Sequence, residues 1–171
     1  MIDGQILIDG AWRESLGGGT IPAINPSDGG RFGSLARGTT EDIDAAVGAA
    51  RASLDGEWGR MPAFERGRVL ARLCQLVLEH VDELAGLEAR DGGKPLRQAR
   101  ADALALARHL EFYGGAADKV HGATIPYQAG YTVMTLREPH GVTGHIIPWN
   151  DPMQILGRSV GAALRWATPP C

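Results

Sequence analysis

A short apolar segment, a crowded turn and a helical pattern follow one another near the end of this 171-residue sequence. Residues 142–147 resemble a buried strand, the turn reads Pro-Trp-Asn-Asp-Pro, and helical periodicity covers residues 152–164. A strand, a tight turn and a helix in this order are the usual opening of a nucleotide-binding α/β unit. The sequence therefore predicts an α/β fold in which residues 142–147 form a parallel strand buried on both faces.

Three longer segments with helical periodicity precede this unit. The first follows a predicted N-cap at Thr40, the second runs from Pro62 to the glycines after Asp91, and the third covers about residues 96–113. Each has an apolar stripe, and we expect the Arg and Glu residues of the second helix on its opposite face. The stripes contain Ile43, Val47, Ala50 and Leu54, then Val69, Leu70, Leu73, Val77, Val81 and Leu84, then Ala99, Ala103, Leu106, Leu110 and Tyr113.

The other patterned segments are typical of short strands. Residues 5–8, 20–24 and 31–36 are separated by glycine-rich turns. Residues 123–126 and 131–137 flank a further turn, which predicts a β-hairpin. Such a hairpin has two open edges and little apolar surface of its own, so we expect it to pack against a partner surface.

The charge and cysteine content exclude several classes of function. Seventeen basic and 20 acidic residues give a net charge of −3, which offers no electrostatic reason to bind nucleic acid or an acidic membrane. Without an apolar run long enough to span a membrane or a signal-like N-terminus, we expect a cytoplasmic protein. Cys74 falls on a helical stripe and is expected to be a packed thiol, and a catalytic role for Cys171, the last residue, is not expected.

The segment REPHGVTGHIIPWNDPMQI resembles a motif of the aldehyde dehydrogenase superfamily. In that family, Arg-Glu-Pro-x-Gly-Val leads into a strand that ends in Ile-x-Pro-Trp-Asn-aromatic-Pro. Further segments resemble the N-terminal third of the same family in the same order, over roughly residues 5–164. They are ILIDGAW, IPAINPSDG, TTEDIDAAVGAAR, RLCQLVLEHVDELAGLEARDGGKPL and HLEFYGGAADKVHGATIP.

The resemblance implies a role for each residue of the crowded turn. Asn150 would donate its amide to the oxyanion that develops during aldehyde oxidation, because an uncharged donor placed there favours the transition state over the ground state. Asp151, where the family has an aromatic, and Ile155 would face the substrate. An anion at that place would weaken substrate binding. The residues that would flank the cofactor, NAD or NADP, are Ile146, Ile147, Pro148 and Trp149.

Structural alternatives stay open for these residues. Trp149 could fill a core and Asn150 could form a turn before Asp-Pro. The resemblance also suggests that Asp91 and the backbone of Ile24 touch a monovalent cation, whereas the simpler interpretation is a turn carboxylate. The hairpin at residues 124–137 is similar to the family's oligomerisation arm, which implies a homo-oligomer.

The resemblance divides the chain into four segments. It offers no counterpart for several catalytic and cofactor-binding residues of the family. Residues 1–120 would begin the nucleotide-binding domain, 121–138 form the hairpin, 139–164 supply the first strand and helix, and 165–171 form a tail outside the family pattern. No residue can be assigned as the nucleophilic cysteine, the glutamate base, the phosphate-binding turn or the ribose-binding lysine. We therefore expect a truncated, inactive aldehyde dehydrogenase that does not bind its cofactor productively.

Two further hypotheses concern the role and the origin of such a chain. The alternative to an inactive fragment is an interaction module that pairs with full-length aldehyde dehydrogenase protomers. The ending RWATPPC could arise from a reading-frame slip, since TGG GCA ACG CCN read two bases later gives Gly-Asn-Ala, the pattern the family has there. A natural tail is the other possibility, and the genomic sequence would decide.

Overall fold

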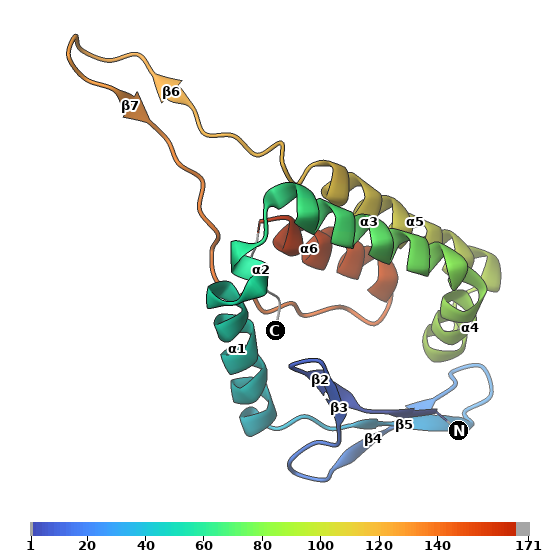
Figure 1. Ribbon diagram of the computed structural model, residues 1–171. Helices are drawn as coiled ribbons and strands as arrows, with labels where there is room; N and C mark the ends of the chain where they lie inside the picture. The colour runs from blue at the N-terminus through green and yellow to red at the C-terminus, as the bar shows by residue number, and fades with distance from the viewer. Residues whose placement is uncertain (1, 167–171) are drawn as a thin grey trace.

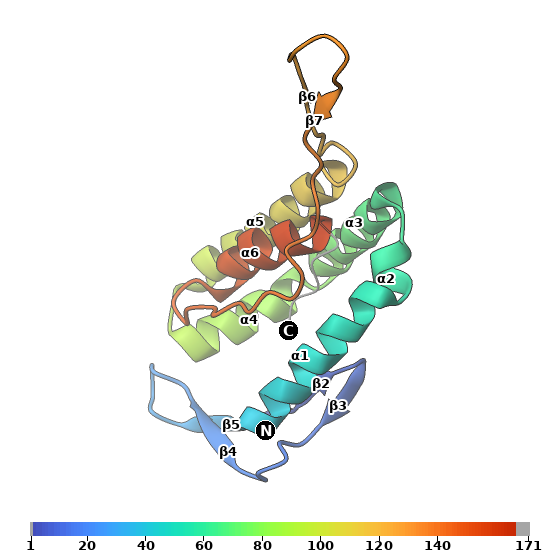
Figure 2. The ribbon, with the colours of Figure 1, turned by 90° about the vertical axis from the view of Figure 1, so that its left-hand side faces the viewer.

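The computed structural model describes residues 2–166, which form a layer of helices above a layer of short strands (Figure 1). Helices α3, α5 and α6 lie side by side, α4 continues from α3, and a hairpin projects away from both layers (Figures 1 and 2). The strands are β1 (Ile2–Gly4), β2 (Ile6–Ile8), β3 (Ala11–Arg13), β4 (Thr20–Ile24), β5 (Arg31–Ala36), β6 (Thr124–Ile125) and β7 (Val133–Met134). The helices are α1 (Thr40–Asp55), α2 (Glu57–Arg60), α3 (Ala63–Glu79), α4 (Val81–Gly92), α5 (Leu96–Gly115) and α6 (Pro152–Arg165).

The strand layer consists of a small sheet and a separate hairpin. The sheet has the order β1-β5-β4, with β1 parallel and β4 antiparallel to β5. The expected strands at residues 20–24 and 31–36 are therefore confirmed. The strand expected at 5–8 is β2, which pairs with β3 through a turn at Asp9 and Gly10, both at positive φ. Asp-Gly is a strong signal for a two-residue hairpin, so β3 could have been predicted.

A buried carboxylate fixes the start of α1. Thr39, one residue before the expected cap, is the N-cap, and it forms a capping box with Asp42. Asp42 also accepts hydrogen bonds from the Ser15 hydroxyl, at 2.9 Å, and from the Leu16 amide. The Thr39 backbone N–H and these further donors lower the pKa of Asp42, against the effect of burial. Asp42 therefore ties the loop before β4 to the first turn of α1.

The core lies where α3, α4, α5 and α6 meet. The second predicted helix is two helices, because the chain bends at His80 between α3 and α4. Gly67 of α3 faces Gly114 of α5 so closely that an added Cβ on Gly67 would lie 2.6 Å from the Gly114 carbonyl oxygen. The buried residues of this core are Leu70, Cys74, Val77, Val81, Ala103, Leu106, Ala107, Leu110 and Met153.

Small residues also let α6 approach α5. Gly157 and Gly161 are buried, and an added Cβ would lie 3.0 Å from His109 Cβ and 2.9 Å from Tyr113 Cδ2, respectively. Met153 belongs to the buried core, and Leu164 packs against it. The predicted helix at residues 152–164 is thus confirmed, with its face toward α5.

The predicted parallel strand at residues 142–147 does not form. The segment is extended, but it contains only an isolated β-bridge at Thr143, and Ile146 is 98% exposed. A central strand needs a hydrogen-bonded neighbour on each side, and residues 2–166 supply none beyond that bridge. The expectation of a strand buried on both faces was therefore wrong for this chain.

The predicted hairpin is present, although its strands are short. β6 and β7 pair antiparallel, and the Thr135 amide extends the pairing by donating to the Ala123 carbonyl at 2.8 Å. Tyr127, Tyr131 and Leu136 are all exposed. The arm therefore carries apolar side chains away from the body of the molecule (Figure 1). Within residues 2–166, no helix combines the length and the hydropathy that crossing a membrane requires.

Candidate functional site

The residues predicted to meet the cofactor and the oxyanion lie on one exposed, extended stretch that ends at α6. Trp149 is 77% exposed, so the alternative that it fills a core is wrong. Asn150 is exposed as well, one residue before the N-cap of α6 at Asp151. The amide of Asn150 is thus free to meet a ligand near the positive end of a helix dipole.

Side-chain contacts hold this stretch against α6. The His145 ring accepts or donates at both nitrogens, with Nε2 2.9 Å from the Thr143 hydroxyl oxygen and Nδ1 in contact with the Ser159 hydroxyl of α6. These polar contacts stand in for part of the pairing that a neighbouring strand would provide. They hold the start of the stretch, just before residues 146–150, against α6.

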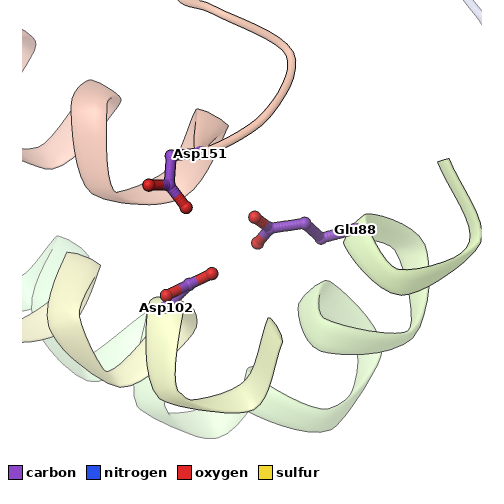
Figure 3. A group of neighbouring side chains, drawn as sticks. All are labelled: Glu88, Asp102 and Asp151. Carbon is purple, nitrogen blue, oxygen red and sulfur yellow. The ribbon is translucent and has the colours of Figure 1, made fainter. Parts of the chain in front are cut away.

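The other end of the turn enters a buried charge cluster, which we call the Lys94 cluster and whose three carboxylates are drawn in Figure 3. It consists of Lys94, Glu88 of α4, Asp102 of α5 and Asp151. The Lys94 ammonium donates to Glu88 Oε1 at 2.6 Å, to Asp102 Oδ2 at 2.5 Å and to Asp151 Oδ1 at 2.8 Å. Figure 3 shows the three carboxylates converging from three segments of the chain. One ammonium therefore joins α4, α5 and the start of α6.

The cluster holds more negative than positive charge. Glu88 has only 3% of its side chain exposed, whereas Asp151 has 37%. Burial raises the pKa of Glu88, and the Lys94 ammonium only partly offsets it. Burial alone would lower the pKa of Lys94, but hydrogen bonds to three carboxylates outweigh it and raise that pKa. Gln154 adds a donor by bonding Asp102 Oδ1 at 2.6 Å.

The cluster settles where the Asp151 side chain lies. Asp151 is the N-cap of α6, but its carboxylate makes no capping bond and bonds Lys94 instead. The carboxylate that was expected to face the substrate is therefore paired with Lys94. Ligand oxygens of Glu88, Asp102 and Asp151 lie within 4.8 Å of one another, a spacing that a metal ion could use. The Lys94 ammonium bonds all three, so it takes the place of such a cation.

Sequence reasoning missed this cluster, although a signal was present. The glutamates of the second helical segment were expected to face outward, and this is wrong for Glu88. Glu88 follows buried Val81 and Ala85 at helical spacing, and Asp102 follows buried Ala99 three residues later. A carboxylate in register with an apolar stripe indicates a buried partner. The stripe itself did not identify Lys94 as that partner.

The other candidate residues, Asp91, Ile155 and Cys74, lie outside the crowded turn. Asp91 lies in the last turn of α4 and lines an apolar cavity of about 340 Å³ with Ala23, the neighbour of Ile24. Its cation stays a prediction, as does a substrate contact of half-buried Ile155. Cys74 is buried, and burial raises the pKa of its thiol, which confirms a packed rather than a reactive cysteine. Residues 167–171, which are most of the tail, lie outside the described part of the chain. The expectation that Cys171 has no catalytic role falls on these residues.

Known proteins match this chain along almost its whole length. A family model described as "Aldehyde dehydrogenase family" matches residues 12–167. Aldehyde dehydrogenase family 2 member B4 of Arabidopsis thaliana, named as mitochondrial, is 47% identical over 162 residues, which are 94% of this chain and 30% of that protein.

Solved structures agree with the sequence matches. A protein of Burkholderia cenocepacia assigned as an aldehyde dehydrogenase superposes with a TM-score of 0.94 at 62% identity, covering 95% of this chain and 34% of that one. The NAD⁺ complex of an aldehyde dehydrogenase from Bacillus cereus superposes with a TM-score of 0.96 at 37% identity. The match covers 99% of this chain and 35% of that one. The chain thus spans about a third of the length of the relatives it matches. The alternative of an interaction module gains no support from these matches.

Proposed function

The chain belongs to the aldehyde dehydrogenase family, and from this membership we propose that it forms the N-terminal third of an NAD(P)-dependent enzyme that oxidises an aldehyde to a carboxylic acid. The observation that carries the proposal is the family match over residues 12–167, which includes the crowded turn and α6. On this proposal, residues 1–120 and 139–164 belong to the nucleotide-binding domain, and the arm at 121–138 interrupts it.

Asn150 is the residue we assign to the chemistry. Its amide would donate a hydrogen bond to the oxygen of the aldehyde as that oxygen gains negative charge. Two features of the turn support the assignment, namely the exposure of Asn150 and its place one residue before the N-cap of α6. The bond from Lys94 to the next residue, Asp151, restrains the turn that carries the amide. Such restraint is what preorganised electrostatic stabilisation requires.

Residues 146–149 would meet the nicotinamide end of NAD or NADP. Ile146 and Trp149 present apolar surface to solvent, which suits contact with a flat aromatic ring. The cofactor is named in the structure of the Bacillus cereus relative, and we carry it to this chain as part of the proposal. The exposed arm at residues 124–137 would contact a second protomer, because it presents unpaired strand edges and apolar side chains. A cytoplasmic location stays a prediction.

These 171 residues alone would not catalyse the reaction. Aldehyde oxidation by a covalent route needs a thiolate nucleophile and a base. Cys74 is buried with a raised pKa, and nothing activates it within the described residues. Asn150 can stabilise an oxyanion only where a nucleophile has created one.

The test is a turnover assay on the purified chain with a panel of aliphatic and aromatic aldehydes. With NAD or with NADP, we expect no reduced nicotinamide above the buffer blank. Turnover that persists through purification and disappears in the Asn150→Ala variant would contradict the proposal, since it would place a complete active site within these residues.

A further inference from the structure

A cavity lined by arginines lies at the other end of α6 from Asn150. It has a volume of about 240 Å³, is partly open to solvent, and lies between the start of α3, the base of the hairpin and the end of α6. Arg66, Arg137 and Arg165 line it, together with Trp166 and several small or apolar residues, and its lining includes no Asp or Glu. The fourteen residues of α6 separate this cavity from the crowded turn by about 20 Å, at about 1.5 Å per residue.

Two of these arginines have buried donors without a partner. Arg66 Nε and Arg165 Nε are inaccessible to solvent and lack a hydrogen-bond acceptor among the described residues. An unsatisfied buried donor is costly, and more so on a charged group. Two such donors on residues that line one cavity indicate that an acceptor belongs there.

The contacts that these arginines do make leave their charge unbalanced. Arg66 donates to the Met61 carbonyl, and Arg165 lies over the rings of Tyr113 and Trp166, at 5.5 and 5.1 Å. Within residues 2–166, no carboxylate pairs with Arg66, Arg137 or Arg165. Burial lowers the pKa of Arg66, as expected for a cation without a counter-ion.

Exposed arginines of the same helical layer show the opposite behaviour. Arg72, Arg100 and Arg108 each have a carboxylate partner although all three are largely exposed. Arg66 and Arg165 are half-buried, and cations withdrawn from solvent ordinarily have the stronger need for a partner. The lining of the cavity therefore has the composition of an anion site rather than that of a solvated basic surface.

We propose that this cavity binds a phosphate group, as inorganic phosphate or as a small phosphomonoester. A tetrahedral phosphate offers oxygens to several guanidinium groups at once, and guanidinium forks match phosphate oxygens in pairs. A planar monocarboxylate would engage one arginine and leave the others unpaired. The cavity lies below the roughly 300 Å³ at which sites for drug-sized ligands begin, so a small ligand fits it best.

The experiment is a titration of the 171-residue chain with inorganic phosphate, at an ionic strength held constant with sodium chloride. The Nε–H NMR signals of Arg66 and Arg165 report directly on the buried donors. We expect both signals, and the indole signal of Trp166, to shift with one saturating curve. The signals of Arg68 and of Trp12 should stay in place, because both residues are exposed and outside the lining.

Matched variants separate a built site from surface charge. Arg66→Gln and Arg68→Gln each remove one positive charge from α3, but only Arg66 lines the cavity. We expect the phosphate affinity to fall about tenfold or more in Arg66→Gln and to change less than about twofold in Arg68→Gln. Arg137→Gln, at an exposed position in the base of the hairpin, should also weaken binding about tenfold, and it keeps the test valid if Arg66→Gln fails to fold.

Two results would overturn the proposal. Equal losses in Arg66→Gln, Arg137→Gln and Arg68→Gln would mean that phosphate responds only to net charge. Acetate or glutarate that shifts the same signals at concentrations as low as phosphate does would mean that the arginines await a carboxylate instead. Neither result depends on the oxidation of an aldehyde, so this inference stands or falls separately from the proposed function.

Discussion

Lys94 supplies the positive charge where α4, α5 and the crowded turn meet. Its ammonium is the cation that the structure places among Glu88, Asp102 and Asp151, two of which are almost fully buried. Removal of the cation would leave buried carboxylates without their partner, and this is costly in a way that the loss of an exposed ion pair is not.

We expect Lys94→Met to lower the free energy of unfolding by about 3 kcal/mol or more. The matched control is Lys119→Met, because Lys119 forms an exposed ion pair with Asp118, and its loss should cost less than about 1 kcal/mol. Urea unfolding of the parent chain and the two variants gives the comparison. Equal effects of the two substitutions would show that the Lys94 cluster is not buried in solution.

Glu88 should make stability depend on pH in a defined direction. Because burial raises its pKa in the folded state above the ordinary value of 4.5, the folded chain holds this proton more tightly than the unfolded chain does. The associated stability is present below pH 4.5 and is lost as the pH rises through the raised pKa. The Glu88→Gln side chain resembles the protonated form of Glu88. The variant should therefore not lose this stability as the pH rises.

The measurement for Glu88 is urea unfolding across a pH series. The free energy of unfolding of Glu88→Gln, minus that of the parent chain, should increase as the pH rises from acid toward neutral. Asp42 has a lowered pKa, so its contribution has the opposite sign and is lost as the pH falls through that value. A pH-independent difference for Glu88→Gln would refute the assigned shift.

Among the elements, helices were predictable because their apolar periodicity is local. The spacing in residues 96–113 and 152–164 predicts α5 and α6 within two residues at each end. Whether residues 142–147 form a strand was not predictable from local sequence, because a parallel strand depends on neighbours elsewhere in the chain. Exposure of Asn150 and Trp149 could likewise not be read from the turn, and the Lys94 cluster needed the three-dimensional meeting of α4, α5 and the turn.

The contact between α3 and α5 should tolerate no side chain at Gly67. The added Cβ of Gly67→Ala would lie 2.6 Å from a backbone oxygen, so the helices must separate, and we expect a loss of about 1–3 kcal/mol. Gly86→Ala on α4 is the control, because nothing lies within 4 Å of its added Cβ and alanine favours helix by about 1 kcal/mol. Thermal unfolding should therefore shift the two variants in opposite directions, and a shift of both to higher temperature would contradict the close contact.

Residues 142–147 should exchange their amide hydrogens freely. The segment has one isolated bridge, whereas the amides of α5 lie in continuous helical hydrogen bonding. Hydrogen exchange followed by mass spectrometry should show peptides from this segment exchanging within seconds to minutes and those from the centre of α5 protected for far longer. Equal protection would indicate that the segment has found a strand partner, for example in a second copy of the chain.

At the scale of the whole molecule, the crowded turn and the segment before it are not covered by other parts of the described chain. In the extended stretch at residues 142–150, Ile146 and Trp149 are exposed. This chain matches about a third of each relative, so each relative has about twice as much further chain. The parts of the proposed active site that these residues supply are thus a turn and an amide.

The most direct test joins residues 1–164 of this chain to the remaining part of the Bacillus cereus aldehyde dehydrogenase in place of that enzyme's own first third. We predict a chimera that oxidises aldehydes with NAD or NADP, and a drop in its kcat of about 10² to 10³ on Asn150→Ala. Gln98→Ala, which removes an exposed amide from the first turn of α5, should leave kcat unchanged. A folded chimera without activity, or one whose kcat does not respond to Asn150→Ala, would contradict the central claim.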